Sequence, residues 1–444
     1  MTGDSQRVFV RTFGCSSNMA DAEFMRGCLV EAGFSLVENA RDADVLVFNT
    51  CAVKSPTENR IIEELREAAK LQRKLLVSGC LPVINLERLS RQVKFDGILG
   101  PSSAGKIVEA VQRVLRGEKI QWLKEESGTG KRSLLNLPKQ AGNPVVSIVP
   151  AAQGCLGSCS YCCVVFARGS LRSYSIDEVV QRVQSDLHSG AKEVWLTAQD
   201  MACYGRDIGT NLPELLKVVC SIDESNFFLR VGMMTPNHAF GILDSLIEAF
   251  LDEHVFKFLH LPVQSGDDTV LKQMNRFYST DDFREIVSSF RKAVPDITIA
   301  TDVICGFPGE SEGAFQRSLR LIEEVKPDVV NISKFFSRPR TLAEKMTSKV
   351  SAAEVKSRSQ NLAGMVRQVS AEKNISWKGW SGKILIDEKG KQQGSWIGRN
   401  FAYKPVVIKS EDDSLLGKSA NVHVVKTFQT YLEAIPEVNN HKAH

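Results

Sequence analysis

The first hundred residues alternate between short apolar runs and amphipathic segments. Three apolar runs, each leading into a cysteine, predict buried strands at residues 8–15, 45–51 and 75–80. Between them, residues 20–31 and 57–72 carry the apolar spacing that is typical of helices facing a core. Because neighbouring parallel strands need a crossover helix, this alternation predicts a doubly wound parallel sheet.

The middle of the chain repeats a strand-then-helix pattern six times from Pro144 onward. Helical spacing, for example over residues 176–187 and 281–293, separates the apolar runs. Six units are too few for a complete eight-fold barrel, so we expect a partial, open-sided (βα)6 barrel. The six predicted strands are residues 145–150, 193–198, 227–231, 256–261, 297–304 and 329–335.

The carboxyl-terminal part predicts a small five-stranded β-barrel of the oligonucleotide-binding kind, because short apolar runs alternate with turns. Aromatic residues are interleaved with cations there, and rings that stack on bases beside cations that contact phosphates are one interpretation. The other interpretation is a small aromatic core beneath solvated cations. The residues concerned are Trp377, Trp380, Trp396, Phe401 and Tyr403, with Lys378, Lys383, Arg399 and Lys404.

These patterns give an α/β protein of three domains. We expect an amino-terminal domain over residues 1–116, a central barrel over 143–348 and a carboxyl-terminal barrel over 376–444. A stretch rich in Gly, Lys, Glu and Ser predicts a linker within residues 117–142. A charged helical pattern predicts a connector over residues 349–375.

Composition and charge narrow the class of protein. The chain has 444 residues, 43% of them hydrophobic, and a net charge of +4, which permits contact with nucleic acid without indicating it. The sequence carries no signal-peptide pattern and no apolar run long enough to span a membrane. We therefore expect a cytoplasmic enzyme without membrane association, whose cysteines are reduced and available for metal.

The densest chemical signal is a C-x3-C-x2-C loop formed by Cys155, Cys159 and Cys162, directly after the first predicted barrel strand. A [4Fe-4S] cluster normally has four cysteine ligands, so three leave one iron open to bind a small molecule. The alternatives are a zinc site, or a disulfide pair with a spare thiol. Zinc loops usually come as two C-x2-C pairs, and no second pair follows here. The spacing therefore favours a cluster with an open position.

A second metal signal comes from Cys15, Cys51 and Cys80, which end the three amino-terminal strands. The carboxyl ends of parallel strands share one edge of a sheet, so we expect these cysteines to converge. Three cysteines at equivalent strand ends favour a second cluster with an open position, and packing or thiol chemistry is the alternative. For the other cysteines, we expect Cys28, Cys220 and Cys305 in the core and Cys163 pointing away from the cluster, and we leave Cys203 unassigned.

Polar residues and glycines gather at the predicted carboxyl ends of the barrel strands, where barrel enzymes carry their sites. Two glycines around a proline follow the fifth strand, and they either allow a ligand to approach the backbone or simply form a turn. His260 ends the fourth strand, and a lone histidine is more often structural than catalytic. The predicted cofactor contacts are Gln199, Arg230, Gly306, Pro308 and Gly309.

Taken together, these motifs resemble the methylthiotransferases of the radical S-adenosylmethionine (SAM) superfamily, over nearly the whole chain and in the same domain order. The family's amino-terminal cluster motifs resemble residues 12–23, 49–54 and 78–82, and its radical SAM loop resembles residues 154–169. Its RNA-binding TRAM domain resembles residues 398–407.

Residues 204–213 and 299–310 look most like the archaeal and eukaryotic branch of that family. Members of this branch methylthiolate N6-threonylcarbamoyladenosine (t6A) at position 37 of tRNA. The chain has no counterpart of the carboxyl-terminal membrane anchor of animal members, which suggests an archaeal-type form. Arg340 stands where the family usually has Gly, and Met19 replaces a common Gln, but no metal ligand is lost.

The resemblance implies two [4Fe-4S] clusters and SAM as cofactors. SAM would bind the open iron beside Cys155, Cys159 and Cys162 and yield a 5'-deoxyadenosyl radical that removes hydrogen from C2 of the adenine. The second cluster would present the sulfur, and another SAM would supply the methyl group. No acid or base could activate such a carbon-hydrogen bond, so no catalytic side chain is assigned.

The implied partners are the tRNA anticodon stem-loop, held by the TRAM-like domain, and an electron donor such as ferredoxin or flavodoxin. Arg206 or Arg340 could pair with the threonyl carboxylate. One alternative is the same chemistry on isopentenyladenosine in tRNA or on a ribosomal-protein aspartate. Others are a radical SAM enzyme of different outcome and a non-catalytic iron-sulfur protein that binds RNA.

Overall fold

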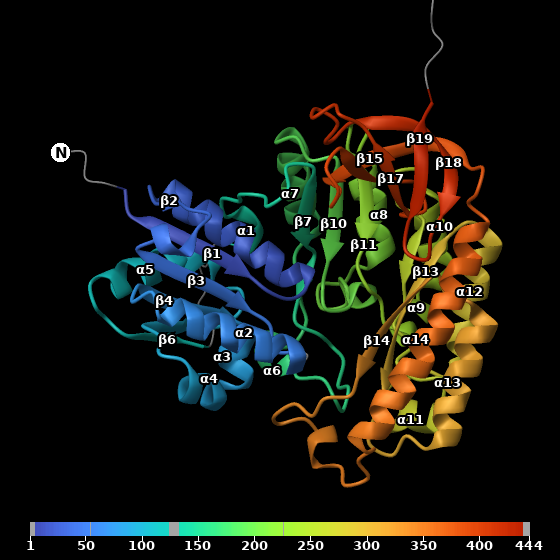
Figure 1. Cartoon of the computed structure of the whole chain (residues 1–444), viewed down its shortest axis with the longest axis horizontal. Helices are drawn as coiled ribbons and strands as arrows, with labels where there is room; N and C mark the ends of the chain where they lie inside the picture. Colours follow the sequence, from blue (N-terminus) through green and yellow to red (C-terminus); the bar gives the residue numbers. More distant parts are fainter. Residues whose placement is uncertain (1–4, 54, 124–132, 225, 438–444) are drawn as a thin grey trace, which may run out of the picture.

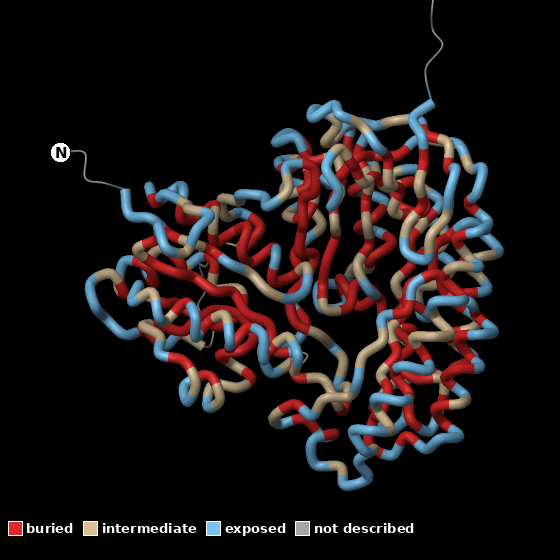
Figure 2. Tube along the Cα trace, viewed as in Figure 1, coloured by how far each residue is buried: buried red, intermediate tan, exposed pale blue. Residues whose placement is uncertain are grey.

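The computed structural model describes residues 5–53, 55–123, 133–224 and 226–437. Three domains follow one another along the chain, with the amino-terminal sheet beside the central barrel and the small terminal barrel packed on one end of the central one (Figure 1). Buried segments run through the strands of all three domains, and exposed residues lie along the outer helices (Figure 2). Among the described residues, no helix combines the length and apolar character needed to cross a membrane.

The amino-terminal domain is a six-stranded parallel sheet of order β2-β1-β3-β4-β5-β6, which confirms the predicted doubly wound sheet. Its strands are β1 Arg7–Thr12, β2 Ser35–Leu36, β3 Val45–Thr50, β4 Lys74–Gly79, β5 Gly97–Leu99 and β6 Ile120–Trp122. Its helices are α1 Ser16–Glu31, α2 Ser55–Ala69, α3 Cys80–Ile84, α4 Leu86–Gln92 and α5 Ile107–Leu115.

The sheet extends beyond the predicted domain boundary at residue 116, because β6 pairs with β5 inside the stretch that was expected to be a linker. Residues 124–132, the most Gly- and Lys-rich part of that stretch, lie outside the described residues. Beyond them, the buried Lys139 side chain forms ion pairs with Glu23 of α1 at 3.4 Å and with Asp186 of the central domain at 2.8 Å. Much of the expected linker is therefore packed structure.

The central domain contains six parallel strands, as predicted. They form two three-stranded sheets, β7-β10-β11 and β12-β13-β14, and a parallel bridge between Leu229 and Val255 joins them. Pairing between β7 and β14 is absent from the described part of the chain, so the arc is an open, partial barrel. The strands are β7 Val146–Pro150, β10 Glu193–Thr197, β11 Phe228–Val231, β12 Phe258–His260, β13 Thr298–Cys305 and β14 Val329–Lys334.

Helices cover the outside of this arc. They are α7 Ile176–His188, α8 Leu212–Cys220, α9 Pro236–Phe240, α10 Leu243–Leu251, α11 Asp268–Gln273, α12 Thr280–Ala293 and α13 Glu312–Val325. Shorter elements follow β7: β8 Ala152–Gln153, α6 Val164–Arg168 and β9 Arg172–Ser173. One continuous cluster of buried apolar side chains includes residues of β1, α1 and α5 as well as the barrel, so the first two domains share a core.

A long helix, α14 Ala352–Ile375, leads to a closed five-stranded barrel of order β15-β16-β17-β19-β18, as predicted. In this barrel β17 and β19 pair in parallel and the other pairs are antiparallel. The strands are β15 Ser381–Lys389, β16 Ser395–Arg399, β17 Pro405–Lys409, β18 Ser419–Thr427 and β19 Leu432–Pro436.

The structure favours the core interpretation for most of the interleaved aromatic residues. Trp377 and Trp396 belong to the buried core of the small barrel, and Tyr403 packs against the central domain. Lys404 is not available to phosphate, because its buried ammonium pairs with Asp328 at 2.8 Å. Phe401, which is 37% exposed, keeps a ring face at the surface.

Candidate metal centres

Cys155, Cys159 and Cys162 lie in the loop between β8 and α6, beyond the carboxyl end of β7. Gly154 opens this loop with a φ of +71°, and a Cβ there would lie 2.0 Å from the carbonyl oxygen of Ser170. The backbone N–H of Cys155 donates to the carbonyl of Gly169 at 3.2 Å, which closes the loop at its base. Only glycine fits at position 154, so the backbone conformation there sets the position of Cys155, the first cysteine of the loop.

The three thiols of this loop are half-buried neighbours. The amide of Gly157 donates to Cys155 Sγ at 3.1 Å, and that of Val164 donates to Cys162 Sγ at 3.5 Å. Burial raises the pKa of Cys155 to about 11 and that of Cys162 to about 12, and the neighbouring Cys159 adds to both shifts. Thiols must lose their protons to bind metal, so a cation here would be bound by exchange for protons. Three converging thiols with amide hydrogen bonds to sulfur suit an iron-sulfur cluster.

The segment after α11 clamps this loop from the opposite side. Ser160 Oγ donates to the carbonyl of Gln273 at 2.8 Å, and its amide donates to that of Met274 at 3.0 Å. Asn275, at a φ of +57°, donates its side-chain amide to the carbonyl of Ser158 at 2.8 Å. These hydrogen bonds therefore tie the cysteine loop to the segment after α11.

Arg276, in this clamping segment, is a candidate site residue that the sequence did not reveal. Its guanidinium lies 5.9 Å from the ring of Tyr161 and 5.7 Å from that of Tyr278. Burial alone would lower the pKa of Arg276, but the nearby tyrosines, Cys159 and Asp200 raise it above its usual value. Its Nε atom is buried without a hydrogen-bond partner among the described residues. No motif or periodicity in the sequence marked this position.

The amino-terminal cysteines converge at one edge of the sheet. Cys15 precedes α1, Cys51 follows β3, and Cys80 is the first residue of α3. Gly14, at a φ of +114°, lets the turn before Cys15 pack against Cys51, since a Cβ at Gly14 would lie 2.7 Å from Cys51 Cβ. Burial raises the pKa of Cys80 to about 12, and the charges of both Cys51 and Cys15 act on it. The donor set again consists of three neighbouring thiols, which fits a second cluster with an open position.

The two cysteine sites lie on facing sides of a tight domain interface. Ser16 Oγ is 2.6 Å from Thr197 Oγ1 at the end of β10, and Gln199 Nε2 donates to Ser17 Oγ at 3.0 Å. Cys163 is buried, and its Sγ faces the carbonyl of Ala52 in the amino-terminal domain at 3.7 Å. The start of α1, which follows Cys15 directly, therefore rests on the mouth of the barrel.

The other predicted cofactor contacts lie apart from one another. Arg230 of β11 stacks on Trp195, Phe258 and Tyr403, with its Cζ atom 4.8 to 5.2 Å from the ring centroids. Since Tyr403 belongs to the small barrel, this guanidinium faces the terminal domain. Its Nε has no hydrogen-bond partner among the described residues.

The turn that contains Gly306, Pro308 and Gly309 packs against α14. Gly306 has a φ of +79°, and a Cβ there would lie 2.2 Å from Val355 Cγ2. Its amide donates to Glu310 Oε2 at 2.7 Å, and that carboxylate also pairs with Arg358 at 2.8 Å. Helix packing and turn closure therefore account for this glycine.

The remaining candidates have structural partners or lie at the surface. His260 Nε2 is 3.2 Å from Asp302 Oδ1. Cys203 is buried beside Asp200 and His238, whose carboxylate and ring are 2.6 Å apart. Cys28 and Cys305 are buried in the shared core, and Cys220 packs against it. Arg206 and Arg340 are both exposed, and the guanidinium of Arg340 donates to the carbonyl of Val83 at 2.9 Å.

Three family models match successive parts of the chain. "Uncharacterized protein family UPF0004" covers residues 7–100, the radical SAM superfamily covers residues 149–322, and the TRAM domain covers residues 383–436. In the structure these parts are the amino-terminal sheet, the open barrel and the small closed barrel. Each matched segment that supplies candidate metal ligands contains all three cysteines of its site.

Among solved structures, the radical SAM methyltransferase TsrM from Kitasatospora setae superposes with a TM-score of 0.55 at 15% identity, over 76% of this chain and 75% of that one. This likeness supports the fold. Curated relatives are more similar in sequence. A protein of Pyrococcus horikoshii named "Probable threonylcarbamoyladenosine tRNA methylthiotransferase" is 41% identical over 96% of this chain and 98% of its own length. The human "Threonylcarbamoyladenosine tRNA methylthiotransferase" is 35% identical over 97% of this chain and 74% of its own length. Two three-thiol sites, three matched domains and full-length similarity together place this chain in the threonylcarbamoyladenosine tRNA methylthiotransferase family.

Proposed function

We propose that this enzyme inserts a methylthio group at C2 of t6A at position 37 of tRNA by radical SAM chemistry. The observation that carries the proposal is the presence of two three-cysteine sites on facing sides of one interface, in a chain whose full-length relatives bear this activity in their names. An enzyme that only cleaved SAM would need one such site. An enzyme that also adds sulfur would need a second site to bind it.

Cys155, Cys159 and Cys162 would hold a [4Fe-4S] cluster whose open iron binds SAM, and SAM supplies the radical that removes the C2 hydrogen. Around that position, Gln199 lies at the barrel mouth with a buried Oε1 that lacks a partner among the described residues. The guanidinium of Arg276, whose buried Nε lacks a partner among the described residues, is suited to the carboxylate of SAM. Arg230 faces the terminal barrel, and the turn with Gly306, Pro308 and Gly309 packs against α14, so these are weaker candidates for contact.

Cys15, Cys51 and Cys80 would hold a second [4Fe-4S] cluster with an open iron for the incoming sulfur. Cys15 is exposed, whereas Cys51 and Cys80 are buried, so the site opens on the side of Cys15. That side adjoins the mouth of the barrel through Ser16 and Ser17. The substrate base could therefore reach both sites from one bound position.

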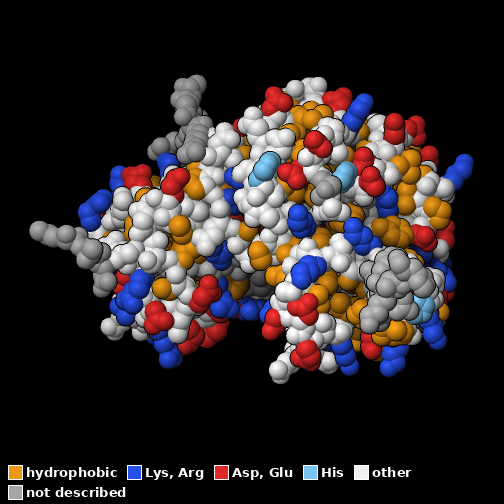
Figure 3. Space-filling model, turned by 90° about the horizontal axis from the view of Figure 1, so that it is seen from above, with side chains coloured by type: hydrophobic (Ala, Val, Ile, Leu, Met, Phe, Trp, Pro, Cys, Tyr) orange, Lys and Arg blue, Asp and Glu red, His pale blue; other side chains and the backbone are white. Residues whose placement is uncertain are grey.

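The RNA would contact the terminal barrel, which packs on the amino-terminal ends of the central strands, and extend from there to the barrel mouth at their carboxyl ends. The surface is indented between the amino-terminal domain and the rest of the molecule, and Lys and Arg side chains lie along this indentation (Figure 3). Exposed Lys378, half-buried Trp380 and exposed Phe401 provide a charged and aromatic surface on the small barrel. An anticodon loop is single-stranded, so its bases can be turned outward at modest cost. A ferredoxin or flavodoxin would supply the electron.

The decisive experiment is anaerobic reconstitution followed by mass spectrometry of tRNA nucleosides. We expect about eight irons per chain and the methylthio derivative of t6A. Product on isopentenyladenosine or on a ribosomal-protein aspartate would assign the same chemistry to another substrate.

Cys51→Ala should still form 5'-deoxyadenosine from SAM but should lose the methylthio product, because only the sulfur-bearing site is damaged. Cys220→Ala, at a partly buried position that packs against the core, is the matched control and should retain both activities. A Cys51→Ala enzyme that still makes methylthio product would contradict the two-cluster proposal.

A further inference from the structure

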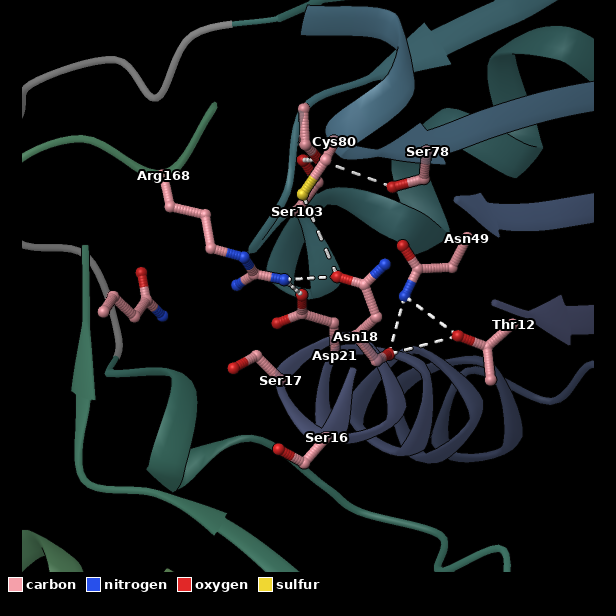
Figure 4. A network of polar contacts seen from close by, with 12 residues as sticks. Thr12, Ser16, Ser17, Asn18, Asp21, Asn49, Ser78, Cys80, Ser103 and Arg168 are labelled. Carbon is pink, nitrogen blue, oxygen red and sulfur yellow. Dashed lines mark hydrogen bonds and ion pairs between the residues drawn. The ribbon is translucent and has the colours of Figure 1, made fainter. Parts of the chain in front are cut away.

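Arg168 belongs to the radical SAM domain but lies in the cysteine site of its neighbour. It is the last residue of α6, and its side chain crosses the interface toward α1 (Figure 4). The side chain is 4% exposed, and Nη2 lies 2.7 Å from Asp21 Oδ2 and 2.6 Å from Asn18 Oδ1. A buried charge is costly unless it is paired, so this arginine requires its partners in the other domain.

Asn18 connects Arg168 to the cysteine loops through hydrogen bonds. While its Oδ1 accepts from Arg168, its Nδ2 donates to the carbonyl of Phe13 at 2.8 Å and to that of Thr50 at 3.0 Å. These carbonyls lie two residues before Cys15 and one residue before Cys51. The third thiol, Cys80 Sγ, is 4.0 Å from Asn18 Oδ1 (Figure 4). One side-chain amide therefore joins Arg168 to all three cysteine segments.

The charge of Arg168 also acts directly on the thiols. Burial alone would lower the pKa of Arg168, but Asp21, Cys80 and Cys15 raise it well above its usual value. The interaction is mutual, since Arg168 opposes the rise that burial causes in the pKa of Cys80 and Cys51. The site thus carries one fixed cation, partly offset by the carboxylate of Asp21.

We propose that Arg168 is a positioning residue that the radical SAM domain contributes to the auxiliary cluster, where its charge raises the cluster's reduction potential. The inference rests on the proposed cluster at Cys15, Cys51 and Cys80. Such a cluster with three thiolates becomes more negative when reduced, and a nearby cation stabilises the more negative form. Asp21 acts in the opposite direction. Substitutions of the two partners should therefore shift the potential with opposite signs.

The test uses the full chain with Cys155→Ala, Cys159→Ala and Cys162→Ala together, so that the auxiliary cluster is the only one bound. An anaerobic redox titration followed by electron paramagnetic resonance gives its midpoint potential. We expect Arg168→Gln to lower this potential and Asp21→Asn to raise it. Arg168→Lys keeps the charge and should stay near the parent value.

A purely structural role for Arg168 would reduce iron content without these opposed shifts, and that result would overturn the inference. Should Arg168→Gln retain no iron, Asp21→Asn still decides, because an unchanged or lowered potential in that variant contradicts the proposal. The parent triple variant distinguishes a failure of the proposed function from a failure of the role proposed for Arg168. If it binds no iron, the two-cluster function fails; if it binds about four irons and the potentials do not move, only the role of Arg168 fails.

Discussion

At the scale of single residues, arginines near the two sites differ in how fully they are paired. Arg340 adopts a φ of +69°, a conformation that favours glycine, which is the residue usual at this position in the family that the sequence resembles. Its guanidinium lies 5.1 Å from the Phe166 ring within the same domain and donates to the carbonyl of Val83 in the amino-terminal domain. Arg276 instead has a buried Nε without a partner in the described chain.

Substitution of Arg276 should therefore weaken SAM binding. We expect Arg276→Gln to raise the Kd for SAM about tenfold or more, because a hydrogen bond to a charged group contributes about 1.5 to 3 kcal/mol. Equilibrium dialysis of labelled SAM against the reconstituted protein measures this directly. Arg284→Gln, which removes a surface pair with Glu324, is the control and should leave the Kd unchanged. An unaltered Kd in Arg276→Gln would rule out this role.

At the scale of elements, the start of β10 meets the small terminal barrel through a buried carboxyl group. Glu193 accepts a hydrogen bond from the Tyr403 hydroxyl at 2.8 Å and another from the Trp195 indole. Burial, followed by the charge of Asp387, raises the pKa of Glu193 to about 7, while Arg399 acts in the opposite direction. The docking of the two domains is therefore sensitive to the charge on this residue.

The sign of the pH dependence follows from that raised pKa. Between its usual value of 4.5 and about 7, the folded protein holds a proton that the unfolded chain releases, so this contribution to stability falls as pH rises. Glu193→Gln should raise the Tm relative to wild type at pH 8 by an amount equivalent to about 1 kcal/mol or more, and by much less at pH 5. Thermal unfolding at both pH values is the measurement, with the exposed Glu388→Gln as control. Equal gains at both pH values would contradict the assignment.

At the scale of the whole molecule, buried ion pairs fasten the amino-terminal domain to the barrel. Arg338, which follows β14, pairs with the fully buried Glu58 of α2 and donates to Ser55 Oγ at 3.0 Å. Glu58 also accepts from Arg88 at 2.7 Å and from Asn85 at 2.8 Å. The pair is asymmetric, because Glu58 also pairs with Arg88, whereas Arg338 has no other carboxylate partner among the described residues.

Removal of the Glu58 carboxylate should lower the free energy of unfolding more than removal of the Arg338 guanidinium. Glu58→Ala leaves Arg338 buried without a counterion, and we expect a loss of about 3 to 5 kcal/mol in the free energy of unfolding. Arg338→Ala should be milder, since Arg88 and Asn85 still satisfy Glu58. Urea unfolding compares the two variants, with Glu63→Ala, which breaks a surface pair with Arg66, as the control. A larger loss in Arg338→Ala than in Glu58→Ala would show that Glu58, and not Arg338, requires the pair.

The sequence predicted the features that depend on local patterns, and it did not reveal the contacts that form between domains. The strands of the two barrels and β1, β3 and β4 follow from apolar runs, and the cysteine sites follow from spacing and from the shared edge of a parallel sheet. The short strands β2, β5 and β6 were not predicted, because two or three residues give too little pattern. Contacts between side chains of different domains leave no such pattern. The pairing of Arg168 with Asp21 and the burial of Lys404 against Asp328 are set by docking, and they became visible only in the fold.

Lys139 gives this docking a further consequence. Its ammonium lies between carboxylates of α1 and α7, and together with the Arg168 and Arg338 contacts it ties the two domains that carry the thiol triads to each other. In the proposed reaction, sulfur would therefore be delivered across this interface without rotation of one domain against the other. The nucleotide would stay in a single pose while both halves of its modification are completed.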